Sequence, residues 1–177
     1  MSDIELAEAS KKYEKQAMAY RQEYIDHGEK IINGSSGLIE YENYDEWLSK
    51  VMFLKQKQCS LTDTPATTHF TIRKKDNKIL GSIQLRHHLT EELKKDGGNI
   101  GYGIRPSERG KGYGTEQLAL VLEKARELNL SRVMISCSKD NKASAEVAIH
   151  NGGLLAGEGF DEDEGKVTEI YWIKLRT

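Results

Sequence analysis

The sequence lacks the features that mark several large classes of protein. Only two cysteines occur among its 177 residues. Cys59 and Cys137 lie far apart without the spacing of metal ligands, which is typical of a protein from a reducing compartment. No apolar run approaches the roughly 20 residues of a membrane helix, and the first residues carry no signal-peptide pattern. We therefore expect a cytoplasmic protein without a membrane partner or a bound metal.

An excess of charge of one sign is also missing. Asp and Glu number 28 against 26 Lys and Arg, so the formal net charge at pH 7 is −2. Nucleic-acid-binding domains usually carry a basic excess, so no nucleic-acid partner is predicted. No repeat or linker divides the chain, which is long enough to bury roughly 70% of its unfolded surface. The sequence therefore predicts one domain over residues 1–177.

The clearest pattern that the sequence does contain runs from Asn99 to Thr115. A short apolar strand leads to a turn at Pro106, and three alternating glycines follow, at positions 110, 112 and 114. After the turn, apolar residues recur at helical spacing, namely Leu118, Val121, Leu122, Ala125 and Leu128. The other face of this helix is polar: Glu116, Gln117, Glu123, Lys124 and Glu127. The pattern predicts a strand, a glycine-rich turn and a helix N-terminus.

Such a turn suits a phosphate ligand. The first N–H groups of a helix lack partners, and glycines adopt positive φ without placing a Cβ in the ligand's way. Two nucleotide motifs fail, however. Lys111 is followed by Gly112 where a P-loop needs Ser or Thr, and a dinucleotide fingerprint would need glycine at Thr115 or Gln117. The open interpretations are another phosphate ligand or a glycine-rich turn without one.

The pattern Arg109-x-x-Gly112-x-Gly114 on a strand-to-helix turn resembles the acetyl-CoA signature of the GNAT superfamily of N-acetyltransferases. The surrounding segment, Ile-Gly-Tyr-Gly-Ile-Arg-Pro-Ser, most resembles the branch that includes ribosomal-protein N-terminal acetyltransferases. This resemblance implies a cofactor-binding core over residues 67–177. Residues 1–66 would then supply elements on the side of the acceptor substrate.

A second motif lies at the spacing that the superfamily requires. The apolar run 132–137 is typical of a buried strand, and a helix that ends near Gly152 follows it. Asn141 matches the cofactor-contacting asparagine of the superfamily, and Ser144 matches its following serine. The resemblance implies a mixed α/β fold, with a twisted, mostly antiparallel sheet, helices on both faces and a splayed parallel strand pair that forms the acetyl-CoA cleft.

The resemblance also implies which residues bind acetyl-CoA. Near a bulge in the central strand, the pantetheine arm would contact Tyr102, Gly103 and Ile104. The pyrophosphate would lie against the turn formed by Arg109, Gly110, Lys111, Gly112, Tyr113, Gly114 and Thr115. Asn141 would hydrogen-bond the cofactor nearby. The side chains of Arg109 and Lys111 either face phosphate oxygens or are merely solvated.

The groups that move protons are harder to identify. Many relatives carry a tyrosine as general acid seven residues after the asparagine, and here that position is Ala148. Some carry a glutamate as general base five residues before it, and here that position is Ser136. His87 and His88 end a predicted strand and are candidate catalytic residues, because imidazole transfers protons near neutral pH. His150 near a helix C-terminus is interpreted as structural.

The rest of the chain shows weaker patterns. Helices are predicted over 10–27 and 44–58, and further strands are predicted over 3–8, 67–73, 78–88, 154–158 and 167–175. Ile79, Ile83 and Leu85 are predicted to share one face of their strand. Residues 89–98 form a charged excursion, and the acidic run 161–164 is interpreted as a solvated turn, because it lacks the spacing of a calcium loop.

The sequence thus predicts an acetyl-CoA-dependent N-acetyltransferase whose acceptor is a primary amine of a small molecule or of a protein N-terminus. The alternative is a CoA-binding sensor or structural module that has lost catalysis, which the alanine at position 148 favours. Whether the protein is a monomer or a homodimer stays open, as does the identity of the amine.

Overall fold

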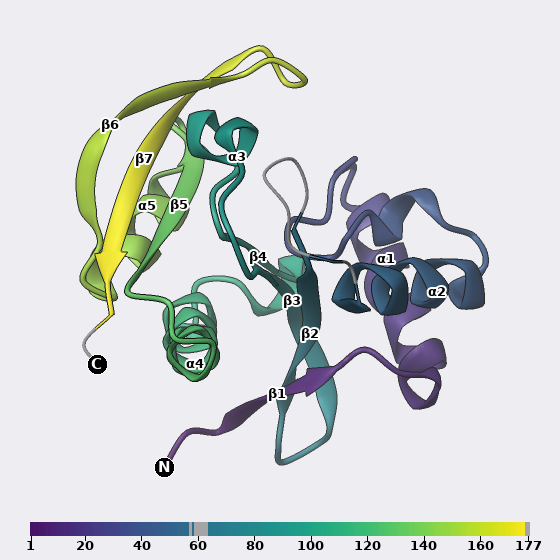
Figure 1. Ribbon diagram of the computed structural model, residues 1–177. Helices are drawn as coiled ribbons and strands as arrows, with labels where there is room; N and C mark the ends of the chain where they lie inside the picture. Colours follow the sequence, from purple (N-terminus) through teal and green to yellow (C-terminus); the bar gives the residue numbers. More distant parts are fainter. Residues whose placement is uncertain (57, 59–63, 176–177) are drawn as a thin grey trace.

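The computed structural model describes residues 1–56, 58 and 64–175 (Figure 1). The strands are β1 Ile4–Glu8, β2 Ala66–Arg73, β3 Lys78–Arg86, β4 Ile100–Ile104, β5 Arg132–Ser138, β6 Leu154–Asp161 and β7 Lys166–Lys174. The helices are α1 Glu14–Asp26, α2 Tyr44–Gln56, α3 Glu91–Lys95, α4 Tyr113–Glu127 and α5 Lys142–His150. Residue 57 of the predicted second helix and Cys59 lie outside the described residues. No described helix is long and apolar enough to span a bilayer.

The strands form two antiparallel sheets, with helices packed on both faces. One sheet has the order β1-β2-β3-β4 and the other the order β5-β7-β6. Helices α1 and α2 pack on the β2–β3 face of the first sheet, while α4 contacts β1, β3 and β4 and also packs against α5. In Figure 1, α1 and α2 lie on one side of the first sheet, and α4 lies between the two sheets. The predicted mixed α/β fold is confirmed.

The predicted splayed pair, β4 and β5, meets only where the two sheets touch. The backbone N–H of Asn99 donates to the Met134 oxygen at 2.8 Å, and Asn99 Oδ1 accepts from the Met134 N–H at 2.9 Å. A single bridge joins Gly98 to Ile135, and no parallel ladder extends it among the described strands. The pairing of β4 with β3 runs without a register shift, so the bulge expected near residues 102–104 is not found.

A bulge does occur in β3. Thr71 pairs with Gly81 and Ile72 pairs with Ile79, so Leu80 is an extra residue on β3. One extra residue reverses which face the following side chains occupy. The prediction that residues 79, 83 and 85 share a face is therefore wrong: Ile79 packs with α1 and α2, whereas residues 83 and 85 belong to the core under α4.

The core on the α1–α2 side is rich in aromatic residues. The predicted stripe of α1 and the turn before it is buried there, namely Tyr13, Ala17, Tyr20 and Tyr24. Phe70 of β2 stacks on Trp47 of α2 at 5.7 Å between ring centroids, and both side chains are fully buried. Burying a Phe side chain contributes roughly 1.5–3 kcal/mol, so this cluster holds the N-terminal helices firmly against the sheet.

Gln117 differs from its prediction. It was expected on the solvent face of α4, yet it is fully buried. Its Nε2 donates to Thr71 Oγ1 at 2.7 Å, to the Ser82 oxygen at 3.1 Å and to the Gly103 oxygen at 3.4 Å. The side chain therefore ties α4 to three strands of the first sheet. The buried face of α4 is therefore wider than the spacing of its apolar residues indicates.

Candidate acetyl-CoA site

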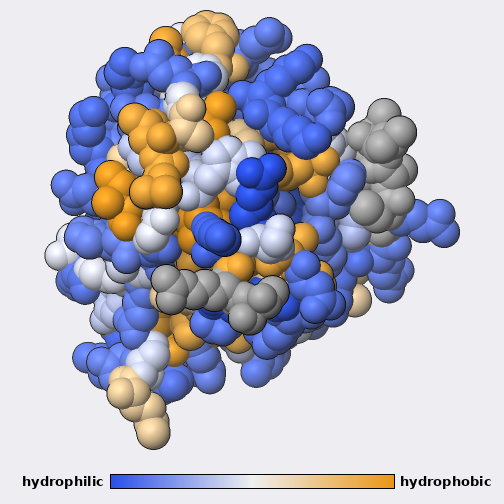
Figure 2. Space-filling view, turned by 60° about the vertical axis from the view of Figure 1, so that its left-hand side comes forward, coloured by the Kyte–Doolittle hydropathy of each residue, from blue (hydrophilic) through white to orange (hydrophobic). Residues whose placement is uncertain are grey.

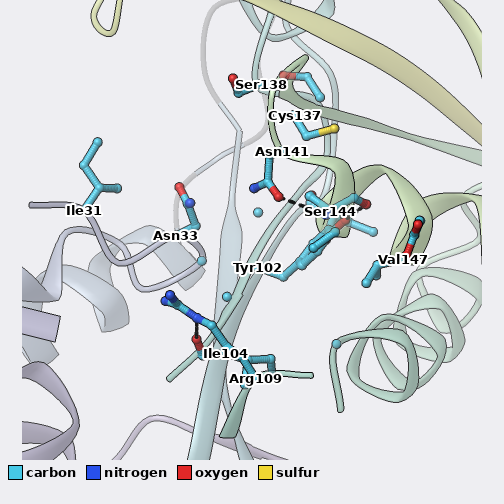
Figure 3. Close-up of a pocket in the computed structure, with 18 of the residues that line it drawn as sticks. Ile31, Asn33, Tyr102, Ile104, Arg109, Cys137, Ser138, Asn141, Ser144 and Val147 are labelled. Carbon is cyan, nitrogen blue, oxygen red and sulfur yellow. Dashed lines mark hydrogen bonds between the residues drawn. The ribbon is translucent and has the colours of Figure 1, made fainter. Parts of the chain in front are cut away.

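A cleft of about 870 Å³ opens between the two sheets. Its walls come from β4 and β5, the turn before α4, the start of α5, the segment after α1 and the β6–β7 hairpin (Figure 3). Most of the residues predicted to bind the cofactor line it: Tyr102, Gly103, Ile104, Arg109, Gly110, Gly112, Tyr113, Gly114, Thr115 and Asn141. A volume of this size is enough for a cofactor-sized ligand.

β4 turns one edge of its backbone toward the cleft. Its ladder with β3 begins at Asn99, whose oxygen accepts from the backbone N–H of Arg86 at 2.7 Å. Because bonding alternates along an antiparallel pair, the N–H and C=O groups of Tyr102 and Ile104 point away from β3. The Ile104 oxygen accepts from Arg109 Nε at 2.8 Å (Figure 3). The other groups of this edge are left for an extended ligand.

The turn before α4 has the geometry of an anion site. Gly110 and Gly112 have φ of 75° and 85°, and a Cβ built on either residue would meet no atom within 4 Å. Gly114 is needed for packing, because a Cβ there would lie 3.2 Å from Val147 of α5. No hydrogen bond from the backbone N–H groups of residues 110–115 is found among the described residues. These free donors and the open space above them fit a diphosphate.

Arg109 is paired with a carboxylate across the rim of the cleft. Its Nη1 and Nη2 donate to the two oxygens of Glu29 at 3.0 and 2.9 Å. Its guanidinium also lies over the ring of Tyr24, 5.4 Å from the centroid. These contacts connect the turn before α4 (residues 110–115, the cofactor turn of the proposed site) to the segment that follows α1.

Lys111 does not line the cleft. Its Nζ donates to Glu108 Oε2 at 2.8 Å, and Lys78 and Arg73 approach the same buried carboxylate at 2.8 and 3.1 Å. Lys111 and Lys78 hold the pKa of Glu108 at about 2. The ammonium of Lys111 therefore serves to neutralise Glu108, and the turn is anchored to the β2–β3 hairpin.

The start of α5 adds polar groups to the opposite wall. Asn141 caps the helix, because its Oδ1 accepts from the Ser144 N–H at 3.1 Å, and no hydrogen bond from its Nδ2 is found within the described part of the chain. Tyr102 Oη lies 2.9 Å from both the Ser144 oxygen and Ser144 Oγ. Burial raises the pKa of Tyr102 and also that of the Cys137 thiol, which lines the cleft beside them (Figure 3).

Several cleft residues were not identified as such by the sequence analysis. Asp96 lines the cleft, and so do Asp161 and Glu164 of the run interpreted as a solvated turn. Ser136, noted only as the position where some relatives carry a glutamate, lines it as well. No local pattern identifies the three acidic residues, since they come from the end of α3 and from the β6–β7 hairpin. The charged excursion 89–98 was the only hint that this part of the chain has a separate role.

The two candidate catalytic histidines lie elsewhere. His87 Nε2 is 2.8 Å from Thr67 Oγ1, and neither His87 nor His88 lines the cleft. Burial lowers the pKa of His87. Ala148, at the position of the usual tyrosine, is fully buried in the core. The helix-end residue His150, by contrast, does line the cleft.

Comparison with known proteins agrees with this geometry. The family model described as acetyltransferase (GNAT) domain matches residues 11–153. Among curated proteins, the ribosomal-protein-serine acetyltransferase of Escherichia coli strain K12 is 34% identical over 84 residues. That match covers 47% of this chain and 45% of the relative, so it spans less than half of the length of either protein.

Solved structures show the same fold. A ribosomal L7/L12 alpha-N-protein acetyltransferase, in complex with coenzyme A bound by a disulfide to one of its cysteines, has a TM-score of 0.71 at 19% identity, over 99% of this chain and 96% of that one. The microcin C7 self-immunity acetyltransferase, in complex with acetyl-CoA and AMP, has a TM-score of 0.71 at 21% identity, over 98% and 93%. Because the family model spans most of the sequence, this protein belongs to the GNAT acetyltransferase family.

Proposed function

We propose that this protein transfers the acetyl group of acetyl-CoA to a primary amine. The observation that carries the proposal is the turn at 110–115, where free N–H groups surround a space that a Cβ at Gly110 or Gly112 would enter. The thioester of acetyl-CoA supplies the activated acetyl group. The residues of this chain bind that cofactor, align the amine and move the protons.

The cleft offers a donor or acceptor for each part of the cofactor. The turn suits the diphosphate, and the edge of β4 at Tyr102 suits an extended amide chain, which would pair with it as an added strand does. Asn141 Nδ2 is placed to donate to the same chain. Several such backbone contacts together supply an affinity in the micromolar range, about 8 kcal/mol.

The hydroxyl pair of Tyr102 and Ser144 is the proposed proton donor to the departing sulfur. Both hydroxyls lie at the cleft wall, 2.9 Å apart, where Ala148 leaves no acid. Because burial raises the pKa of Tyr102, its hydroxyl stays protonated at neutral pH. The reference pKa of a cysteine thiol is about 8.5, and the CoA thiol is similar. The CoA thiolate is therefore a good leaving group that needs only a weak proton donor.

The acceptor is proposed to be either the α-amine of a protein N-terminus or the amine of a small molecule. The first choice follows the curated relative, a ribosomal-protein-serine acetyltransferase, and the second follows a structural neighbour described as a spermidine N-acetyltransferase. A cytoplasmic location fits both. The rival function, a CoA-binding sensor without catalysis, shares the cofactor site and differs only in turnover.

The test is calorimetric titration of acetyl-CoA into the wild type and into Gly112→Val. We expect micromolar binding to the wild type and at least a tenfold loss in the variant, because valine fills the space above the turn. Gly28→Val is a matched control. Gly28 also has positive φ, 79°, and an open Cβ position, and it lies outside the cleft, so it carries the same strain of roughly 1–2 kcal/mol.

Turnover separates the enzyme from the sensor. A panel of peptides with free α-amines and of small alkylamines is screened for release of the CoA thiol. Thiol release that requires an amine supports the transferase. Binding of acetyl-CoA without release by any amine supports the sensor, and failure of the wild type to bind acetyl-CoA contradicts both.

A further inference from the structure

Ser136 stands where some GNAT relatives carry a glutamate, and the structure brings a different carboxylate to that place. Ser136 Oγ donates to Asp96 Oδ1 at 2.5 Å, although 40 residues separate the two along the chain. Both side chains line the cleft. A carboxylate is thus present at this point of the cleft, supplied by the end of α3 in place of β5.

The carboxylate of Asp96 is held in a fixed orientation. The hydroxyl of Thr168 also donates to its Oδ1, at 3.3 Å, and the N–H of Gly97 donates to Ser136 Oγ at 3.2 Å. The chain then turns sharply through Gly98, where a Cβ would lie 2.4 Å from the Met134 oxygen. Among the described residues, no hydrogen bond to Asp96 Oδ2 is found, so this oxygen is left for a ligand.

Asp96 lies on the side of the opening opposite to the cofactor turn. Along β5, Ile135 and Cys137 pack into the core with α4 and α5. Side chains alternate along a strand, so Ser136 projects to the other face and meets Asp96 there. The turn at 110–115 begins α4 on the core side. An amine that approaches from the Asp96 side therefore reaches the opening without crossing the diphosphate site.

Charged groups of β3 and of the β6–β7 hairpin line the cleft together with Asp96. Arg86 of β3 donates to the oxygens of residues 97 and 98 at 3.3 and 3.0 Å and lines the cleft. Asp161, Glu164 and Lys166 of the β6–β7 hairpin line it as well. Lys166 Nζ lies 3.4 Å from Glu164 Oε2, so these two residues form an ion pair without net charge. Arg86 offsets one of the two remaining carboxylates, Asp96 and Asp161, so these five groups together keep one negative charge, which favours a cationic acceptor.

We propose that Asp96 is a catalytic residue that binds the acceptor's ammonium group and receives its proton. This step rests on the proposed acetyltransferase function. One N–H bond of the ammonium breaks, its electron pair stays on nitrogen as the nucleophilic lone pair, and the proton forms an O–H bond with Asp96 Oδ2. Water then takes the proton, which restores the carboxylate. Ser136 and Thr168 are positioning residues that hold Oδ1.

A carboxylate base favours one class of amine. The reference pKa of an α-amino group is about 7.7–8.0 and that of an alkylammonium such as lysine is about 10.4. The equilibrium constant for moving the proton to a given carboxylate is therefore at least a hundredfold larger for an α-amine than for an alkylammonium. The acceptor class assigned to this site is the α-amino terminus of a peptide or protein.

The test measures kcat/KM from pH 5.5 to 9.5 for a short peptide with a free α-amine, with wild type, Asp96→Asn and Ser136→Ala. A general base contributes typically 10²–10⁴-fold. We expect Asp96→Asn to lower kcat/KM about a hundredfold at pH 7 and to change its pH dependence. The wild type should be nearly flat below the pKa of the amine. The variant should rise tenfold per pH unit, because only unprotonated amine then reacts.

Controls distinguish this role from a structural one. Asparagine keeps the shape of aspartate, so the affinity for acetyl-CoA and the melting temperature should stay unchanged. Glu91→Gln removes an exposed carboxylate from the same helix and should keep the wild-type profile. A flat profile in Asp96→Asn, or equal turnover of an alkylamine and the peptide by the wild type, would overturn the assignment. A wild type without any amine-dependent turnover overturns the proposed function itself.

Discussion

Two basic side chains of the cofactor turn, Arg109 and Lys111, are bound to carboxylates in the structure. Arg109 holds Glu29 across the rim, whereas Lys111 holds Glu108 behind the turn. At the scale of single residues, the sequence shows that both side chains are positively charged but not which carboxylate each one binds. In the proposed function, backbone N–H groups would therefore bind the diphosphate, and the lysine supports the loop that presents them.

His87 and His88 supply a prediction at the same scale. Since neither lines the cleft, His87→Ala and His88→Ala should leave the shape of the pH profile of kcat/KM unchanged. Loss of the contact between His87 and Thr67 should lower the free energy of unfolding by about 1 kcal/mol. Stopped assays across pH 5–9 and urea unfolding of each variant measure these effects. If the wild-type profile of kcat/KM changes slope near pH 6.5 and a variant's profile lacks that change, the replaced histidine has a catalytic role after all.

At the scale of elements, the turn before α4 depends on what lies beneath it. Glu108, 4% exposed, joins the short 3-10 turn Pro106–Glu108 to the β2–β3 hairpin through Arg73 and Lys78. The glycines keep the surface of the turn open, and the ion pairs fix its position from below. A loop with several positive-φ residues keeps one shape only when its surroundings hold it in this way.

Glu108→Gln should therefore destabilise the fold in a pH-dependent manner. The pKa of Glu108 is lowered from 4.5 to about 2, so ionised Glu108 stabilises the protein by roughly 3 kcal/mol above pH 4.5. A lowered pKa means that this contribution is lost as pH falls from 4.5 toward 2. The difference in unfolding free energy between wild type and variant should thus be about 3 kcal/mol at pH 7 and should shrink below pH 4.5.

Urea unfolding at pH 7, 4 and 3 measures this difference. Glu123→Gln is the control, because Glu123 forms an exposed ion pair with Arg126 on α4, and such pairs contribute at most about 1 kcal/mol. A stability loss for Glu108→Gln that is the same at pH 7 and pH 3 would mean that packing, and not charge, holds the turn.

The whole molecule consists of two sheets that share a core and little backbone pairing. They meet at the bridge between Gly98 and Ile135, and residues of α4 and α5 belong to the core that both sheets share. Figure 2 shows groups of hydrophobic side chains within a mostly hydrophilic surface. Among the described residues, exposed large hydrophobic side chains occur on α5 and the β6–β7 hairpin, namely Ile149, Leu154, Leu155, Phe160 and Val167. The cleft is lined by β4 of the first sheet and β5 of the second, so a ligand bound in it would contact both sheets.

Acetyl-CoA should therefore raise the melting temperature. A ligand at 100 times its Kd stabilises the folded state by about 2.7 kcal/mol. For a protein of this size that corresponds to an increase of roughly 5–10 °C. Scanning calorimetry of the wild type with and without acetyl-CoA measures the shift, and Gly112→Val should lack it. An unchanged wild-type melting temperature at saturating acetyl-CoA would contradict binding between the two sheets.

Some features followed from the sequence alone because they depend on neighbours in the chain. The glycine spacing at 110–114 and the tyrosine stripe of α1 are local patterns, since backbone dihedrals and helix faces are set within a few residues. The order of elements was predictable for that reason, whereas the residues expected to line the cleft followed from the resemblance to the GNAT superfamily. The N-cap role of Asn141, by contrast, was found only in the structure.

Other features were decided only when the chain folded. The contact of Asp96 with Ser136 spans 40 residues and that of Gln117 with Thr71 spans 46. The bulge at Leu80 reverses a strand face that alternation alone predicted otherwise. Each of these depends on which elements pack together and in what register, and hydrophobic periodicity does not record that. The order of elements and the glycine-rich turn were therefore set by local sequence, while the register of the sheet and the position of Asp96 were decided by tertiary packing.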